Sequence, residues 1–242
     1  MKKEERRKHR GMAPQDRLFF DPERVDLLKE AVSDLSYLRY RGYPQKASIA
    51  LIGNHYQLTA RERLALAHAA SNAEERLPPV TLHALQGATL CIDGFNLLIL
   101  LESALGGGVL IRCRDGLIRD IANIHGSYRI RAETEEAITL VAQALKKLKV
   151  KKAIWYFDRP VSNSGRIAEM VQKVARKYKS PMEAVTADRV DTLLKKCPDV
   201  AVTADSAILE SGVRWFDLGG WILENWQLHA NIVDLSPKKG ER

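Results

Sequence analysis

The sequence has few cysteines and no pattern that would use them. Its three cysteines, Cys91, Cys113 and Cys197, are far apart and form no CxxC pair. Thiolate zinc sites and disulfide frameworks need paired or regularly spaced cysteines. The sequence therefore predicts neither kind of site.

Long apolar runs are also missing. A membrane-spanning helix needs about 20 consecutive, mostly apolar residues, whereas the longest candidate here extends only from Leu97 to Leu101. The basic N-terminal run MKKEERRKHRG is not followed by the apolar stretch of a secretory signal. We therefore expect a cytoplasmic protein that has no membrane partner.

Composition and charge narrow the class of protein further. Hydrophobic residues make up 45% of the 242 residues, enough for a packed core and too many for wholesale disorder. The 38 Lys and Arg exceed the 30 Asp and Glu, for a formal net charge of +8. A positive charge of this size fits a polyanion such as nucleic acid, but it also fits an ordinary solvated surface. The charge alone leaves both interpretations open.

The first part of the chain has helical patterns. Residues 1–16 read as a flexible basic arm, and residues 17–86 as a small all-helical domain. Asp21-Pro22-Glu23 is a typical helix start, because Asp caps the helix and Pro suits its first position. Thr59 and Glu62 form a capping-box pattern before a further apolar helix.

Residues 87–242 read as a second domain of a different class. Short apolar runs alternate there with helical patterns, which predicts a mainly parallel sheet flanked by helices, an α/β/α domain. Residues 109–121 depart from this alternation, since Asp115-Gly116 between two apolar runs predicts a β-hairpin insertion. Strands are expected at 88–92, 153–157, 183–186, 200–203 and 213–216, and helices at about 95–105, 132–149, 163–179, 188–196 and 205–211.

Four of the expected strands are followed by an aspartate. Parallel strands bring their carboxyl ends to one edge of the sheet, where ligands of such folds bind. A single Asp after a strand is usually a helix cap, but four in register point to a shared site. The aspartates are Asp93, Asp158, Asp188 and Asp205, and Asp191 follows Asp188 by one helical turn.

Several carboxylates at one edge need a cation. They would otherwise repel one another, and hard oxygen ligands suit Mg²⁺ or Mn²⁺. A cation held in this way activates water and stabilises the leaving oxygen in phosphodiester hydrolysis. The aspartates therefore predict a metal-dependent phosphodiesterase.

The same segments resemble a known family. The runs IDGFN at 92–96, IWYFD at 154–158, TAD at 186–188 and VTADS at 202–206 are similar, in this order, to the motifs of PIN-like nucleases of the NYN branch. The resemblance covers about 87–218. It implies a PIN-like fold, a carboxylate-held Mg²⁺ or Mn²⁺ ion and cleavage of RNA, less often DNA. A helical domain before a PIN-like domain also resembles an uncharacterised prokaryotic family.

The resemblance assigns roles residue by residue. It implies that Asp93, Asp158, Asp188 and Asp205 are the catalytic, metal-binding acids. Asn96 and Ser206 match supporting positions beside the first and last acid, and Asp191 is a further ligand candidate. The mid-domain glutamate of the wider family has no clear counterpart; the candidates are Glu102, Glu135 and Glu136.

Two polar segments are candidates for nucleic-acid contact. One follows Asp158 and opens a helix whose exposed N–H groups and arginine suit a phosphate, although simple capping explains it as well. The other is a basic stretch with one aromatic, which either contacts nucleic acid, with Tyr128 stacking on a base, or is a surface loop. The first contains Ser162, Asn163, Ser164 and Arg166, and the second contains Asn123, His125, Arg129 and Arg131.

Three functions remain after this reading. The first is a ribonuclease dependent on Mg²⁺ or Mn²⁺, and the second is a non-catalytic RNA-binding protein with a degenerate PIN-like site. The third is a small-molecule phosphatase; its haloacid-dehalogenase type needs a second Asp where this chain has Phe95. A homo-oligomer is compatible with each of them.

Overall fold

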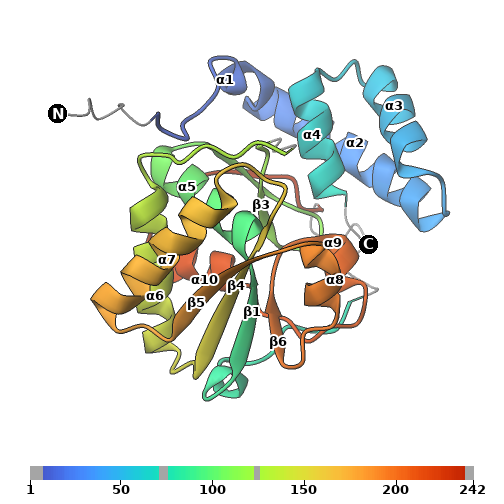
Figure 1. Ribbon diagram of the computed structural model, residues 1–242. Helices are drawn as coiled ribbons and strands as arrows, with labels where there is room; N and C mark the ends of the chain where they lie inside the picture. Colours follow the sequence, from blue (N-terminus) through green and yellow to red (C-terminus); the bar gives the residue numbers. More distant parts are fainter. Residues whose placement is uncertain (1–7, 71–75, 123–125, 238–242) are drawn as a thin grey trace.

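The computed structural model describes residues 8–70, 76–122 and 126–237 (Figure 1). A helical region comes first in the chain, and a mixed α/β domain follows it. Within the described ranges, no helix is both long and apolar enough to cross a membrane.

The larger sheet contains four strands in the order β5-β4-β1-β6, and each neighbouring pair is parallel. β1 lies inside the sheet, where Cys91 is opposite Ile154 of β4 on one side and Ala201 of β6 on the other. Because all four strands run the same way, their carboxyl ends share one edge, as the sequence predicts. The strands are β1 Thr89–Asp93, β4 Lys152–Asp158, β5 Met182–Ala187 and β6 Val200–Val202.

Helices cover both faces of this sheet (Figure 1). One layer contains α5, α6 and α7, with α10 packed against α5 and α6, and the other contains α8 and α9. Side chains alternate between the layers, so Ile92 belongs to the first core and Cys91 to the second. The result is the α/β/α domain that the sequence predicts. The helices are α5 Gly94–Gly106, α6 Thr134–Lys147, α7 Ser164–Tyr178, α8 Val190–Lys195, α9 Ser206–Leu209 and α10 Leu218–Asn225.

A second, smaller sheet forms around the predicted hairpin. β2 (Val109–Arg112) and β3 (Ile118–Asp120) are antiparallel, which confirms the hairpin, and β7 (Asn231–Asp234) adds to β2 in parallel. The strand expected at 213–216 is wrong. Only an isolated bridge joins Ala201 to Trp215, because β6 is three residues long and the chain turns into α10 directly afterwards.

The helical region has the start signals seen in the sequence. Asp21 accepts a hydrogen bond from the backbone of Arg24, and Thr59 and Glu62 form a reciprocal capping box. These caps satisfy N–H groups that have no partner inside the helix. The elements are α1 Asp16–Phe19, α2 Pro22–Tyr40, α3 Gln45–His55, α4 Ala60–Ala69 and the 3₁₀ turn η1 Leu82–Leu85.

The helical region and the small sheet share one hydrophobic core. Leu28 and Leu35 of α2 and Leu66 of α4 are fully buried in a cluster that also contains Ile111 of β2 and Val233 of β7. The hairpin insertion is therefore the surface on which the helical region packs. The two regions do not have separate cores at this boundary.

The sequence predicts a flexible arm over residues 1–16, but the structure shows residues 8–16 in contact with the α/β domain. The Nε atom of Arg10 lies 2.8 Å from a carboxylate oxygen of Glu102, which is fully buried. A Cβ atom on Gly106 would come within 2.6 Å of the carbonyl oxygen of Arg10, so glycine lets the two backbones approach. Glu102 thus anchors this segment and does not reach the aspartates. Residues 1–7 lie outside the described part of the chain.

We expect Leu66→Ala to lower the free energy of unfolding by about 2–5 kcal/mol, because it leaves a cavity in the shared core. Chemical denaturation followed by circular dichroism measures this loss. Unfolding should remain a single transition, since both regions contribute to the same core. Leu51→Ala is the matched control, because the Leu51 side chain is 61% exposed. Two separate transitions, of which only one shifts, would contradict the shared core.

Candidate active site

Asp93 is fixed where β1 ends and α5 begins. Its Oδ1 atom accepts a hydrogen bond from the backbone N–H of Asn96 at 3.3 Å, which caps the helix. Its Oδ2 atom accepts one from the hydroxyl of Thr203 at 3.0 Å. The side-chain oxygen of Asn96 accepts from the backbone N–H of Ala204 at 3.0 Å. Asp93 and Asn96 therefore connect the end of β1 to the segment that follows β6.

The glycine after Asp93 has a packing reason. A Cβ atom on Gly94 would lie 2.5 Å from the ring of Phe157 and 2.7 Å from the carbonyl oxygen of Tyr156. Contacts this close are not tolerated, so only glycine fits between β1 and β4. The Asp-Gly pair of the motif thus places the carboxylate directly at the sheet edge.

Three other carboxylates lie at this edge. The pKa of Asp93 is raised to about 7, first by burial and then by the nearby charges of Asp205 and Asp191, while its two hydrogen bonds act in the opposite direction. The pKa of Asp158 is also raised, first by burial and then by the charge of Asp191. We call Asp93, Asp158, Asp191 and Asp205 the carboxylate group. Its members repel one another, as expected for acids that share a site.

Backbone hydrogen bonds hold two members of the carboxylate group. Asp205 caps α9, because its Oδ1 atom accepts from the backbone N–H of Ala207 at 2.7 Å and of Ile208 at 3.3 Å. Asp158 accepts from the backbone N–H of Val190, the first residue of α8. This contact brings the first turn of α8, and with it Asp191, towards the end of β4.

Asp188 follows β5 and pairs with an arginine. Its Oδ2 atom is 3.4 Å from Nη1 of Arg159, and both side chains are more than half exposed. The next residue, Arg189, has a left-handed φ of 56°, so the chain changes direction between Asp188 and α8. Asp191, the weaker candidate from the sequence, is the one whose charge acts on both Asp93 and Asp158.

The donor chemistry of the carboxylate group fits a hard divalent cation. Carboxylate oxygens are the ligands that Mg²⁺ and Mn²⁺ prefer, and a bound cation would stabilise the ionised form of Asp93, which burial and the charges of Asp205 and Asp191 disfavour. In the described residues, no three His, Cys, Asp or Glu side chains already form a group that could hold a metal. Binding would therefore require side-chain rotation, which the exposed Asp191 permits most easily.

The segment after Asp158 is used to hold a neighbouring loop. The hydroxyl of Ser162 donates to the carbonyl oxygen of Tyr128 at 3.0 Å, and the side-chain amide of Asn163 donates to the same oxygen at 2.8 Å. Tyr128 itself is fully buried, so the expectation that it stacks on a base is wrong. The hydroxyl of Ser164 donates to the carbonyl oxygen of Arg159 at 3.4 Å.

The remaining candidates differ in exposure. Arg129 and Arg166 are exposed and available to a ligand, and Ser206 is half-buried at the start of α9. Glu135 and Glu136 are exposed on α6. Asn123 and His125 lie outside the described residues.

Sequence reasoning missed two residues at this edge. Thr203 donates to Asp93 and accepts from the backbone N–H of Asp205 at 3.1 Å, so it orients both ends of the group. Arg159 pairs with Asp188. Thr203 belongs to the Val-Thr-x-Asp motif, so the sequence could have indicated its role. Arg159 is an exposed arginine after a strand, and no motif marks it.

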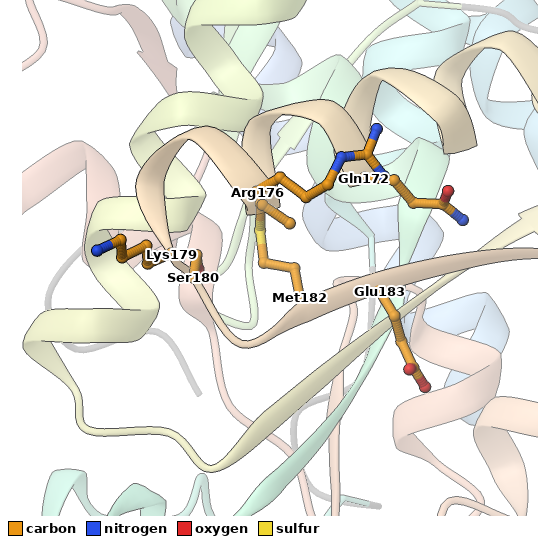
Figure 2. A pocket seen from close by; sticks show the side chains of 7 residues that line it. Gln172, Arg176, Lys179, Ser180, Met182 and Glu183 are labelled. Carbon is orange, nitrogen blue, oxygen red and sulfur yellow. The ribbon is translucent and has the colours of Figure 1, made fainter.

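A surface hollow of about 490 Å³ lies away from the carboxylate group. Figure 2 shows Gln172 and Arg176 on α7 beside the beginning of β5, where Met182 and Glu183 lie. The carboxylate group is at the other end of the strands. The amide of Gln172 donates to the carbonyl oxygen of Ala184 at 3.3 Å and so covers part of this edge strand. None of the predicted site residues lines the hollow.

Comparison with known proteins supplies a family. The description "Domain of unknown function (DUF5616)" matches residues 82–221. The chain belongs to the DUF5616 family. The description "Protein of unknown function (DUF434)" matches residues 27–77, within the helical region. The DUF5616 match contains every member of the carboxylate group.

A relative matches most of the chain. The uncharacterized protein MJ0935 of Methanocaldococcus jannaschii is 33% identical over 188 residues, which cover 76% of this chain and 89% of the relative. No solved structure matches the chain significantly.

The raised pKa of Asp93 predicts a pH dependence of stability. Between its ordinary value of 3.8 and about 7, the native state binds more protons than the unfolded chain, so stability falls as the pH rises through this range. We expect Asp93→Asn to remove the part of this fall that Asp93 contributes, on the order of 1–4 kcal/mol. The parts contributed by Asp120, Asp158 and Asp217, whose pKa values are also raised, should remain. Chemical denaturation at several pH values in EDTA measures the fall.

The control for this prediction is Asp188→Asn. The Asp188 carboxylate is exposed and lies against Arg159, so its removal should leave the slope of stability against pH unchanged. If Asp93→Asn leaves the slope of the unfolding free energy against pH unchanged, the pKa of Asp93 is not raised and the prediction is wrong.

Proposed function

We propose that this DUF5616 protein is a metal-dependent nuclease, most simply a ribonuclease. It would hydrolyse phosphodiester bonds with a Mg²⁺ or Mn²⁺ ion held by Asp93, Asp158, Asp191 and Asp205. The observation that carries the proposal is the position of Asp93, Asp158 and Asp205 at the carboxyl edge of a parallel sheet, with Asp191 near enough for its charge to act on the first two. Ligands of open α/β sheets bind at this edge, beside the strand where the order reverses. Here that strand is β1, which ends in Asp93.

The chain's own residues would prepare the site for the cation. Thr203 and the backbone N–H of Asn96 hold both oxygens of Asp93, so the carboxylate keeps one orientation. Asp158 and Asp205 are fixed in the same way by backbone N–H groups. A bound divalent cation supplies a water of lowered pKa and neutralises charge on the phosphate. Below about pH 7 the proton on Asp93 would compete with the cation.

Arginines around this edge would contact the nucleic-acid backbone. Arg159 follows β4 directly, and Arg129 and Arg166 are exposed on the loop and helix held by Ser162 and Asn163. A guanidinium group can donate two parallel hydrogen bonds to a phosphate, which suits a polyanionic partner. The net charge of +8 supports the same class of partner.

A cleavage assay tests the proposal. End-labelled single-stranded RNA and DNA are incubated with the wild-type protein in Mn²⁺, Mg²⁺ or EDTA. We expect metal-dependent cleavage, and a loss of at least about 100-fold in Asp93→Asn, because a cation ligand is removed. Asp191→Asn should lose more activity than Asp188→Asn, since only Asp191 belongs to the carboxylate group. Equal activity of Asp93→Asn and wild type would contradict the proposal.

The alternative is a non-catalytic RNA-binding protein with a degenerate PIN-like site. Intact substrate in every lane, with RNA still shifted on a native gel in EDTA, would favour it. That binding should weaken steeply with salt, because phosphate contacts release counterions. Arg166→Met would then reduce the salt dependence while Asp93→Asn would not.

A further inference from the structure

A second site lies where the N-terminal segment, the helical region and the α/β domain meet. It is a pocket of about 200 Å³, and three arginines from distant parts of the chain line it. In Figure 1 the N-terminal segment and α1 pass over this end of α5. The pocket is lined by His9, Arg10, Gly11, Ala13, Arg61, Ser103, Gly108, Val109, Ile121, Ala122 and Arg131.

The wall of the pocket is basic and contains no carboxylate. Arg10 and Arg61 are each balanced by a buried acid behind the wall, Glu102 at 2.8 Å and Asp16 at 2.9 Å. Arg131 pairs with no carboxylate among the residues that the structure describes. Two further acids lie nearby, since Glu133 pairs with His9 at 2.6 Å and the charge of Asp120 acts on Arg10 and Arg61, but neither forms an ion pair with Arg131.

Two guanidinium groups of the wall carry buried N–H groups that lack a partner. In the described chain, Nη2 of Arg10 and Nε of Arg131 are buried and make no hydrogen bond. The side chain of Arg10 is only 9% exposed. Buried donors without acceptors are costly and rare in native structures. Both side chains line the pocket, so an acceptor bound there would satisfy these groups after a small shift of each guanidinium, because neither atom is open to solvent as it stands.

Arg61 contributes a rigid part of the wall. Its Nε and Nη2 atoms bind the two oxygens of Asp16, and its Nη1 atom donates to the carbonyl oxygen of Ile121 at 2.8 Å. The charge of Asp120 also reaches Arg10 and Arg61, but its Oδ1 atom accepts from the backbone N–H of Ala122 and the residue does not line the pocket.

We propose that this pocket binds a phosphate group. Donors from Arg10 and Arg131, with the hydroxyl-bearing Ser103, come from different walls, which suits a tetrahedral oxyanion better than a planar carboxylate. The volume is below the range of roughly 300–1,000 Å³ typical of pockets for drug-sized ligands, so the ligand is small. Inorganic phosphate and a small phosphomonoester share this chemistry.

Phosphate binding would join three parts of the chain. The ligand would contact the N-terminal segment through Arg10, and the α/β domain through Arg131 and Ser103, beside Arg61 of the helical region. Ligands that bind only the native state raise its stability in proportion to the logarithm of their concentration. The full chain should therefore become more resistant to heat in phosphate.

The experiment is a titration of the full chain with inorganic phosphate in EDTA, followed by thermal unfolding and isothermal calorimetry. Sodium chloride at equal ionic strength is the reference, and glycerol phosphate is the second arm. We expect saturable binding and a higher melting temperature in phosphate than in chloride. Stronger binding of glycerol phosphate would identify a phosphomonoester as the ligand, and weaker binding would identify free phosphate.

Variants assign the binding to this pocket. Arg131→Met should weaken the phosphate affinity by about tenfold or more, and Arg131→Lys should restore part of it, because the charge remains but the paired donors are lost. The Arg131 guanidinium makes no hydrogen bond in the described chain, so its removal breaks no native pair. Arg17→Met, an exposed arginine on α1, is the control and should bind as wild type does. Equal effects of phosphate and chloride, or unchanged affinity in Arg131→Met, would overturn the proposal.

Discussion

Asp93 uses both carboxylate oxygens to tie the end of β1 to its surroundings, one to the first turn of α5 and one to Thr203 after β6. This arrangement places a charge close to Asp191 and Asp205 and away from water, so the carboxylate is held at a cost. A cation bound at the site would compensate this cost, and the hydrogen bonds would hold the carboxylate ready for it. The proposed chemistry depends on this fixed orientation of Asp93.

Packing elsewhere in the fold holds the ends of β1 and β4 and the helix α5 in place. Gly94 lets β1 and β4 pack closely where Asp93 is opposite Tyr156, two residues before Asp158, because a side chain there would meet Phe157. The small sheet lies on the other side of α5 and carries the helical region on a shared core. A buried Glu102 fixes the N-terminal segment to the same helix. α5 is thus in contact with both the candidate active site and the phosphate pocket.

Strand and helix periodicity predicted most of the α/β domain, because alternating buried residues and Asp caps are local signals. The Asp115-Gly116 turn predicted the hairpin. The sequence did not predict β7, because its pairing partner β2 is over 100 residues away in sequence and nothing local marks the strand. The site was predicted in part. Asp93, Asp158 and Asp205 follow strands whose register the sequence already implies.

The choice between Asp188 and Asp191 depended on backbone geometry that the sequence does not reveal. Arg189 has a left-handed conformation without being a glycine, and it turns the chain after Asp188. The burial of Tyr128 and the docking of Arg10 likewise follow from contacts between distant segments. Such contacts are not encoded in any short motif. The exchange of Asp188 for Asp191 in the proposed metal site rests on such contacts.

The most direct test of the central claim is Mn²⁺ binding measured by electron paramagnetic resonance at pH 8. Free Mn²⁺ gives a strong signal that is lost on binding, so wild-type protein should reduce it saturably. Asp93→Asn should weaken that binding by at least about tenfold, because one carboxylate ligand is replaced by a neutral amide. Saturable binding by wild type that Asp93→Asn loses would support a metal site at the carboxylate group. Binding that is absent, or equal in the two proteins, would contradict it.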